Sequence, residues 1–269
     1  MSIKYAYLGP AGTFTEAALL KIAASDDQLI AYANVTAALD AVRKGEANKA
    51  LVPIENSVEG VVARTLDELA SGEPLVITAE TTLPVTFSLM TLENKDPKDI
   101  KSIATHPHAE SQCRSFIAKN YPNAQVIETA STAAAAKGLS KGDYDAAIGA
   151  AIAAKNYQLK IIAEDIGDNT SAVTRFVVVE KPGKSPAATG KDRTSLAVFI
   201  AIDHAGALLE ILNEFAKHQV NLSFIQSRPT GSQLGHYHFI IDAEGHIDDQ
   251  PVAAALAGLK EICQDIRFL

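Results

Sequence analysis

The stretch Asn169-Thr170-Ser171-Ala172-Val173-Thr174-Arg175-Phe176 follows a long series of alternating strand and helix patterns. It continues as Val177-Val178-Val179, and an apolar run of this kind is typical of a buried strand. Thr174 and Arg175 are therefore expected at the mouth of a strand, where α/β folds place ligand chemistry. A guanidinium can bind a carboxylate with two hydrogen bonds, and a hydroxyl can give or take a proton. The alternative is a strand start with an exposed Arg175 and no ligand.

The composition is that of an ordinary globular protein, with 47% hydrophobic and 21% charged residues in a chain of 269. The net charge of −8 argues against nucleic acid or an anionic membrane as the main partner, although a local cationic pocket can still hold an anionic substrate. No leader-like segment or bilayer-spanning run is evident. Cys113 and Cys263 have no metal-ligand spacing and are predicted to be buried thiols. We therefore expect a cytoplasmic protein.

The first strand pattern, residues 3–8, leads into the turn Gly9-Pro10-Ala11-Gly12-Thr13-Phe14-Thr15-Glu16 and then a helix over residues 17–24. A strand, a glycine turn and a helix produce a helix N-terminus with free N–H groups, which attracts anions. Thr13 or Thr15 is expected to cap that helix. The alternative is a capped turn with no ligand.

A second polar strand end follows the buried strand pattern of residues 49–54. Glu55, Asn56 and Ser57 come directly after it, and a helix is predicted over residues 61–70. Amide and hydroxyl groups are good neutral partners for the carboxylate or hydroxyl groups of a small substrate. The alternative is that Asn56 or Ser57 only caps the helix.

Two histidines, His106 and His108, follow a strand predicted over residues 100–105. Pro107 lies between them and no third ligand is evident, so we predict a turn that lines a cleft and no metal site. A single helix is expected after them, over residues 109–120.

The region after residue 180 has a different pattern. Residues 181–193 are predicted as a linker, because their first part is rich in Pro, Gly and Lys and lacks periodicity. Beyond it the chain reads as βαββαβ, the ferredoxin-like plan of an interaction or ligand-sensing unit. The predicted elements are a strand at 194–202, a helix at 206–218, strands at 221–227 and 235–242, a helix at 252–263 and a strand at 266–269.

Five short motifs in order resemble the prephenate dehydratase family over almost the whole chain. They are Gly9-Pro10-Ala11-Gly12-Thr13-Phe14, Pro53-Ile54-Glu55-Asn56-Ser57-Val58-Glu59-Gly60, Thr105-His106-Pro107 with Gln112-Cys113, Ser131-Thr132-Ala133 with Ala135-Ala136, and Thr174-Arg175-Phe176. The trailing unit resembles an ACT domain, with Gly206-Ala207-Leu208 and Ser227-Arg228-Pro229 as its two motifs.

The resemblance implies an α/β catalytic domain over residues 1–180 with two lobes, like a type II periplasmic-binding protein, and an α+β ACT domain over residues 194–269. Lobe one is expected to take about residues 1–80 and 161–180, and lobe two about residues 82–160, with Pro84 at the first crossing. The cleft between the lobes would hold prephenate, which loses carbon dioxide and water to become phenylpyruvate without a cofactor.

The resemblance also implies roles for particular residues. Thr174 would donate a hydrogen bond or a proton to the departing hydroxyl, and the substrate-binding groups would be Arg175, Asn56, Ser57, Thr13 and Phe176. Arg175 could instead brace its lobe, and we expect Glu55 to be structural. Phenylalanine would bind the ACT unit between paired subunits of a homodimer or homotetramer, through Gly206, Ala207, Leu208, Gln226, Ser227, Arg228 and Pro229.

Two positions depart from the family pattern. Gln226 stands where the family usually has Glu, which puts phenylalanine affinity or the sign of regulation in question. Ala172 stands where Asn is frequent, so that a polar contact is missing or Asn169 replaces it. Two other functions stay open: dehydration of arogenate, and amino-acid sensing without catalysis.

Overall fold

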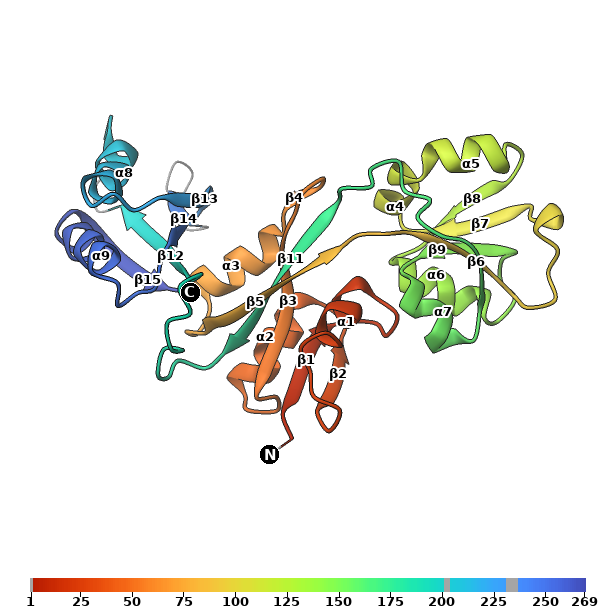
Figure 1. Ribbon diagram of the computed structural model, residues 1–269, viewed down its shortest axis with the longest axis horizontal. Helices are drawn as coiled ribbons and strands as arrows, with labels where there is room; N and C mark the ends of the chain where they lie inside the picture. The colour runs from red at the N-terminus through yellow and green to blue at the C-terminus, as the bar shows by residue number, and fades with distance from the viewer. Residues whose placement is uncertain (1, 201–203, 231–236) are drawn as a thin grey trace. The chain divides into compact units, whose positions relative to one another are not determined.

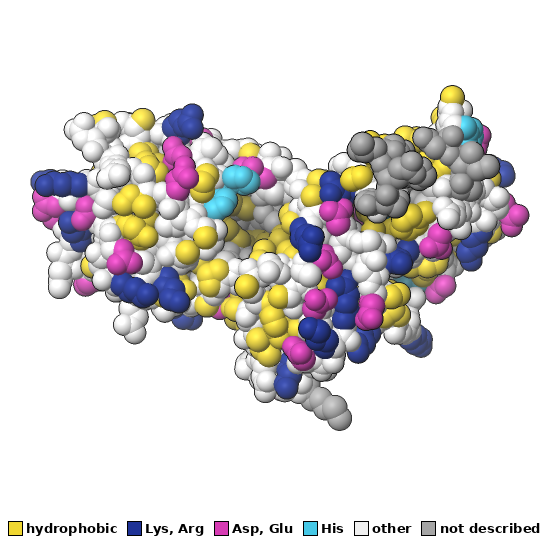
Figure 2. Space-filling view, turned by 180° about the vertical axis from the view of Figure 1, so that it is seen from behind, with side chains coloured by type: hydrophobic (Ala, Val, Ile, Leu, Met, Phe, Trp, Pro, Cys, Tyr) yellow, Lys and Arg dark blue, Asp and Glu magenta, His cyan; other side chains and the backbone are white. Residues whose placement is uncertain are grey.

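The structure is a computed structural model that describes residues 2–200, 204–230 and 237–269 (Figure 1). The chain forms two compact units: Met1–Val62 with Ala79–Val179, and Ala63–Thr78 with Glu180–Leu269. Within the described residues, no helix combines the length and hydropathy needed to cross a bilayer. On the face in Figure 2 the acidic and basic side chains are interspersed, which fits the net charge of −8.

The first sheet, which we call lobe one with its helices, has the strand order β2-β1-β3-β11-β5. Strands β1, β2 and β3 are parallel, whereas β11 runs antiparallel to β3. Helices α1 and α2 connect the parallel strands, which need crossovers. The bounds are β1 Lys4–Leu8, α1 Phe14–Leu19, β2 Gln28–Tyr32, α2 Val35–Arg43, β3 Lys49–Asn56, β4 Gly60–Val61, β5 Val76–Pro84 and β11 Val173–Glu180.

The second sheet, which we call lobe two with its helices, has the strand order β10-β6-β9-β7-β8. Its bounds are β6 Ser88–Thr91, η1 Pro97–Asp99, β7 Ser102–Thr105, α4 Pro107–Gln112, α5 Arg114–Asn120, β8 Gln125–Glu128, α6 Thr132–Leu139, β9 Ala146–Gly149, α7 Ala151–Tyr157 and β10 Lys160–Ala163. Because β10 pairs with β6, the chain returns to lobe one after Ala163 and not at residue 161 as predicted.

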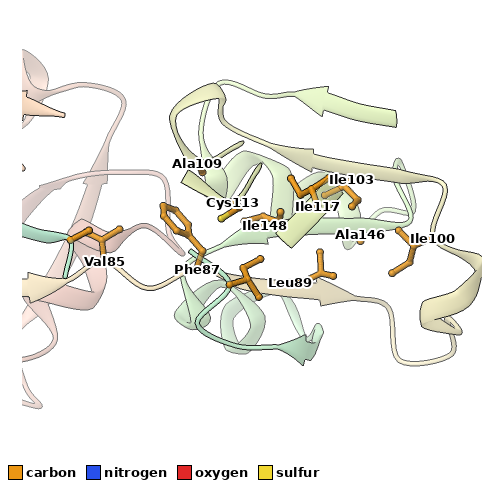
Figure 3. Packing of buried hydrophobic residues seen from close by; sticks show 12 residues of the cluster. Val85, Phe87, Leu89, Ile100, Ile103, Ala109, Cys113, Ile117, Ala146 and Ile148 are labelled. Atoms are coloured by element: carbon orange, nitrogen blue, oxygen red, sulfur yellow. The ribbon is translucent and has the colours of Figure 1, made fainter. Parts of the chain in front are cut away.

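The core of lobe two is an apolar cluster that extends to the segments between the lobes (Figure 3). Leu89, Ile103 and Ile148 lie in its interior, and Phe87 and Val85 lie toward the crossing segments. Buried Cys113 belongs to the same cluster and separates α4 from α5, so the single helix predicted over residues 109–120 is wrong.

The two segments that cross between the lobes are hydrogen-bonded to each other. Val85 N donates to Ala172 O over 2.7 Å, and Ile166 N donates to Phe87 O over 3.0 Å, so these segments lie side by side (Figure 1). Ala172 is 1% exposed and packs in the apolar cluster, which explains why a small apolar residue suits this position. The Asn169 Oδ1 accepts hydrogen bonds from the backbone and the hydroxyl of Ser171.

The second unit contains α3, Ala63–Ser71, and a four-stranded antiparallel sheet with the order β13-β14-β12-β15. This order and the βαββαβ sequence confirm the ferredoxin-like plan. The bounds are β12 Arg193–Ile200, α8 Ala207–Lys217, β13 Leu222–Pro229, β14 Tyr237–Glu244, α9 Gln250–Ile262 and β15 Cys263–Phe268. The predicted strand end at Ile202, the Gly231-Ser232 turn and the strand start at Gly235 lie outside the described residues.

Candidate active site

Thr174 and Asn56 face each other across two paired strands of lobe one. Strand β11 begins at Val173, so Thr174 lies inside the strand and not at its mouth, and its register partner on β3 is Asn56. The Asn56 Nδ2 donates a hydrogen bond of 2.8 Å to the Thr174 Oγ1. Thr174 is 8% exposed, so this contact is largely shielded from water.

The orientation of the Asn56 amide follows from its other hydrogen bonds. Its Oδ1 accepts from Val58 N over 2.8 Å and from Glu59 N over 2.9 Å, so the amide oxygen must face the backbone and the amide nitrogen must face Thr174. Because the Asn56 amide presents only an N–H to Thr174, the Thr174 O–H cannot donate to that amide and can donate to another acceptor. The site therefore presents a hydroxyl donor beside the Asn56 amide.

Ser57 holds the start of β11 through two hydrogen bonds to Val173. Its hydroxyl accepts from Val173 N over 2.9 Å, and its own N–H donates to Val173 O over 2.9 Å. The structure thus brings Ser57, Asn56 and Thr174 together at one end of the β3–β11 pair. The alternative that Asn56 or Ser57 only caps a helix is wrong, because α3 does not begin until Ala63.

Arg175 makes an ion pair within its own lobe. Its Nε donates to the Glu80 Oε2 on β5 over 2.7 Å, and its side chain is only 9% exposed, so the alternative of an exposed arginine is wrong. Successive side chains on a strand point to opposite faces, so Arg175 and Thr174 leave β11 on opposite sides. The arginine therefore does brace the lobe, by joining β11 to β5.

Thr13 is the N-cap of α1 and has both hydrogen-bonding capacities in use. Its Oγ1 accepts from Glu16 N over 3.3 Å and donates to Leu8 O over 3.2 Å, so Thr15 is not the cap. The anion expected at this helix start is supplied by the chain itself, because the Glu16 Oε2 accepts from Gly12 N over 2.6 Å. This arrangement favours the capped turn without a ligand.

Phe176 lies in the core and not in the site. Its ring is 1% exposed and packs with Tyr7, Leu19 and Val178 in the core cluster of lobe one. The prediction that Phe176 contacts the substrate is therefore corrected, because a side chain enclosed by core residues cannot reach a ligand in the cleft.

The two histidines cap and flank α4. The His106 Nδ1 accepts from His108 N, and burial followed by the nearby His108 lowers the pKa of His106. The His108 Nδ1 lies 3.3 Å from the Glu59 Oε2 of lobe one. Among the described residues, no group of three or more potential ligands could hold a metal ion.

Glu59 and Gln112 received no role from the sequence, yet they meet between the lobes. The Gln112 Nε2 donates to the Glu59 Oε1 over 2.9 Å. The only sequence signal was that both residues belong to the motifs that carry the family resemblance.

The predicted effector residues lie at the start of α8 and along β13. Gly206, with φ +100°, precedes α8, and the Gln226 amide donates to Ser227 O. Arg228 is already engaged, because its Nε and Nη2 donate to the two oxygens of Asp67 over 2.8 and 2.7 Å. A cavity of about 340 Å³ adjoins the start of α8, and Ala207 is the one predicted effector residue that lines it.

Comparisons with known proteins agree along the whole chain. The sequence model of the prephenate dehydratase family matches residues 5–184, and that of the ACT domain matches residues 194–261. A prephenate dehydratase of Amycolatopsis methanolica is 46% identical over 267 residues, 99% of this chain and 87% of the relative.

Two solved structures share the fold of the whole chain. The crystal structure of a prephenate dehydratase from Arthrobacter aurescens, in complex with L-Phe, is 50% identical with a TM-score of 0.94, and the match covers 99% of this chain and 89% of that one. GqqA, described as a novel type of quorum-quenching acylase, is 25% identical with a TM-score of 0.88, covering 99% and 96%.

Proposed function

The chain belongs to the prephenate dehydratase family and carries a C-terminal ACT domain, and from this premise we propose how its residues carry out the reaction. The activity is the decarboxylating dehydration of prephenate to phenylpyruvate, a carbon–oxygen lyase reaction. Loss of carbon dioxide and water makes the ring aromatic, which supplies a large driving force. The chain therefore has to hold two carboxylates and assist the departing hydroxyl.

Thr174 donates the hydrogen bond that assists this departure. A free threonine hydroxyl is a far weaker acid than ordinary general acids, so it needs help from a neighbour. The Asn56 N–H that donates to the Thr174 oxygen polarises the hydroxyl and strengthens it as a donor, since hydrogen bonds in a chain reinforce one another. As the carbon–oxygen bond breaks, charge grows on the leaving oxygen and this hydrogen bond strengthens.

The hydrogen bond between Asn56 and Thr174, with the amide held by two backbone N–H groups, is the observation that carries this proposal. It assigns Asn56 to orienting Thr174 and not to binding the substrate. Such an arrangement is pre-organised, because the donor direction is set before the substrate arrives.

Ser57 is the proposed partner of a substrate carboxylate. Arg175 pairs with Glu80 on the side of β11 opposite to Thr174, and we assign it to bracing the lobe. The Ser57 hydroxyl accepts from Val173 N and can still donate its proton to a ligand. Thr13 is assigned to capping α1.

The ACT domain takes L-phenylalanine as a feedback effector. The L-Phe complex of the Arthrobacter aurescens relative supports this proposal. We place the amino acid at Gly206–Leu208 and Gln226–Pro229, between paired subunits of a homo-oligomer. Leu209 and Ile225 are 60% and 45% exposed, and such apolar side chains suit a pairing surface. Light scattering coupled to gel filtration checks the oligomer, and calorimetry with L-phenylalanine checks binding; no heat at millimolar ligand would contradict this site.

We also propose that the protein acts in the cytoplasm. Cys113 and Cys263 are free thiols in the structure, as a reducing compartment allows. Fractionation of the native host checks this location.

An ultraviolet assay for phenylpyruvate formed from prephenate tests the proposed activity directly. The Thr174→Ala variant is expected to lose orders of magnitude in kcat while circular dichroism stays unchanged. A turnover near that of the wild type would remove Thr174 from the mechanism. Arogenate in place of prephenate, with phenylalanine as the product measured, decides between the two substrates. Absence of turnover with either would favour a sensing protein.

A further inference from the structure

The hairpin of residues 56–61 makes a polar contact between the lobes. It leaves β3 at Asn56, turns, and returns as the short strand β4 (Figure 1). At its tip the Glu59 carboxylate of lobe one reaches α4 of lobe two. There it accepts from the Gln112 Nε2 over 2.9 Å and lies 3.3 Å from the His108 Nδ1.

The same residue also holds the amide that orients Thr174. The backbone N–H of Glu59 donates to the Asn56 Oδ1, and the Asn56 Nδ2 donates to the Thr174 Oγ1. Two sets of hydrogen bonds, joined through the covalent structure of Glu59, therefore connect α4 of lobe two to the hydroxyl of Thr174.

We propose that Glu59 is a positioning residue that couples closure of the two lobes to the orientation of the Thr174 hydroxyl. This inference rests on the proposed prephenate dehydratase activity and adds a role that the reaction itself does not require. When lobe two engages the carboxylate, the tip of the hairpin is held and its N–H fixes the Asn56 amide. When the lobes part, the hairpin loses this support, and the donor is no longer aimed.

The contact of Glu59 with Gln112 and His108, which we call the latch, is weak enough to break and re-form. The Glu59 and His108 side chains are 36% and 64% exposed, so their attraction is weakened by water. The Gln112 Oε1 is buried and has no hydrogen-bond partner among the residues that the structure describes, so closing the latch costs the solvation of that oxygen. These terms offset the hydrogen bond from the Gln112 amide and keep the latch reversible.

The turn of the hairpin faces open space at Gly60. Gly60 has φ +83°, a conformation that favours glycine, and no atom lies within 4 Å of the position that a side chain would occupy. Strand β4 has only two residues, Gly60 and Val61. The turn is therefore not packed against the rest of the lobe, and the Glu59 contact is suited to holding it.

A second contact between the lobes provides a matched control. The Asn156 Nδ2 of α7 donates to the Glu16 Oε2 of lobe one over 2.7 Å. This hydrogen bond also joins the lobes, but Glu16 bonds to Gly12 N and to the Tyr7 hydroxyl and not to Asn56. Removing it leaves the Glu59–Gln112 contact, the hairpin and the hydrogen bonds to Thr174 in place.

The test compares Glu59→Ala, Glu59→Gln and Asn156→Ala in the full chain by steady-state kinetics with prephenate. We expect Glu59→Ala to lower kcat about tenfold or more, which corresponds to about 1.4 kcal/mol or more of transition-state stabilisation. Glu59→Gln keeps an acceptor for the Gln112 amide and should recover most of kcat. Asn156→Ala should leave kcat within about twofold, because the Glu59 contact that holds the hairpin and the Asn56 amide is still made.

A double-mutant cycle with Gln112→Ala completes the experiment. The double variant Glu59→Ala/Gln112→Ala should have the same kcat as Glu59→Ala, because both changes break one contact. A wild-type kcat in Glu59→Ala, or an equal loss of kcat in Asn156→Ala, would overturn the coupling. Thermal melting shows whether each variant is folded. If Glu59→Ala does not fold, Gln112→Ala decides the question, because it breaks the same contact from the other lobe and should lower kcat in the same way. If the wild type itself made no phenylpyruvate, the proposed function would be overturned instead.

Discussion

Replacement of Asn56 by aspartate tests the aimed hydroxyl most directly, because it changes one atom and little of the shape. The carboxylate keeps an oxygen for the N–H groups of Val58 and Glu59, whose hydrogen bonds are 2.8 and 2.9 Å long. The atom that faces Thr174 becomes an oxygen that can only accept. The Thr174 hydroxyl then turns its proton toward this carboxylate and stops donating to the substrate.

The expected cost follows from the number of hydrogen bonds lost. Removal of one pre-organised donor to a developing negative charge lowers kcat by about 10²–10³, or about 2.7–4 kcal/mol. The negative charge beside an anionic substrate adds to this loss through KM. Stability should change by only about 1 kcal/mol, because the backbone N–H groups keep their acceptor.

The assay is phenylpyruvate formation followed by its ultraviolet absorbance, with thermal melting measured in parallel. Asn34→Asp is the matched control: Asn34 caps α2 by accepting from Ala37 N, a role that aspartate fills equally well, so its kcat should equal that of the wild type. A folded Asn56→Asp variant with a wild-type kcat would refute the reasoning that Asn56 orients Thr174.

Three further predictions follow from the charged groups. Arg175→Ala should lower the melting temperature through loss of the Glu80 ion pair, and a large rise in KM with unchanged melting would show that Arg175 binds the substrate and does not brace the lobe. Asp67→Asn should weaken the ion pair that holds Arg228 and therefore reduce inhibition by L-phenylalanine, while kcat without the effector stays constant. Identical inhibition curves for the variant and the wild type would contradict this prediction. The pKa of Asp145 is lowered from 3.8 to about 2, mainly by the hydrogen bond from Lys95. The ionised carboxylate therefore stabilises the folded chain by about 2 kcal/mol above pH ~4. This contribution is lost as the pH falls through ~2. Urea unfolding at pH 7 and pH 2.5 should therefore show a smaller difference in Asp145→Asn than in the wild type.

Elements whose signals are local could be predicted from the sequence. The ferredoxin-like order emerged because each element carries its own period and its own breakers. The cap of α1 was narrowed to Thr13 or Thr15 from neighbouring residues alone, and the structure shows Thr13 accepting the backbone hydrogen bond.

Two features of the fold were not predicted from the sequence, because tertiary packing overrides the local pattern. Strand β2, residues Gln28–Tyr32, lies at the edge of its sheet, and its short apolar run over residues 29–32 has no period that distinguishes a strand from a helix. The break between α4 and α5 at Cys113 follows from packing that thiol into the core of lobe two, which no helical periodicity records.

From the order of residue types along the chain, Thr174 could be predicted as a site residue, and the fold classes and the family resemblance could be established. Which groups each side chain contacts depends on the folded chain. Asn56 lies 118 residues from Thr174, and their contact depends on the register between β3 and β11. Glu80 and Asp67 likewise meet their arginines only in the folded chain. Hydrogen bonds and ion pairs act over a few ångströms, and that distance between remote residues is set by strand pairing and packing.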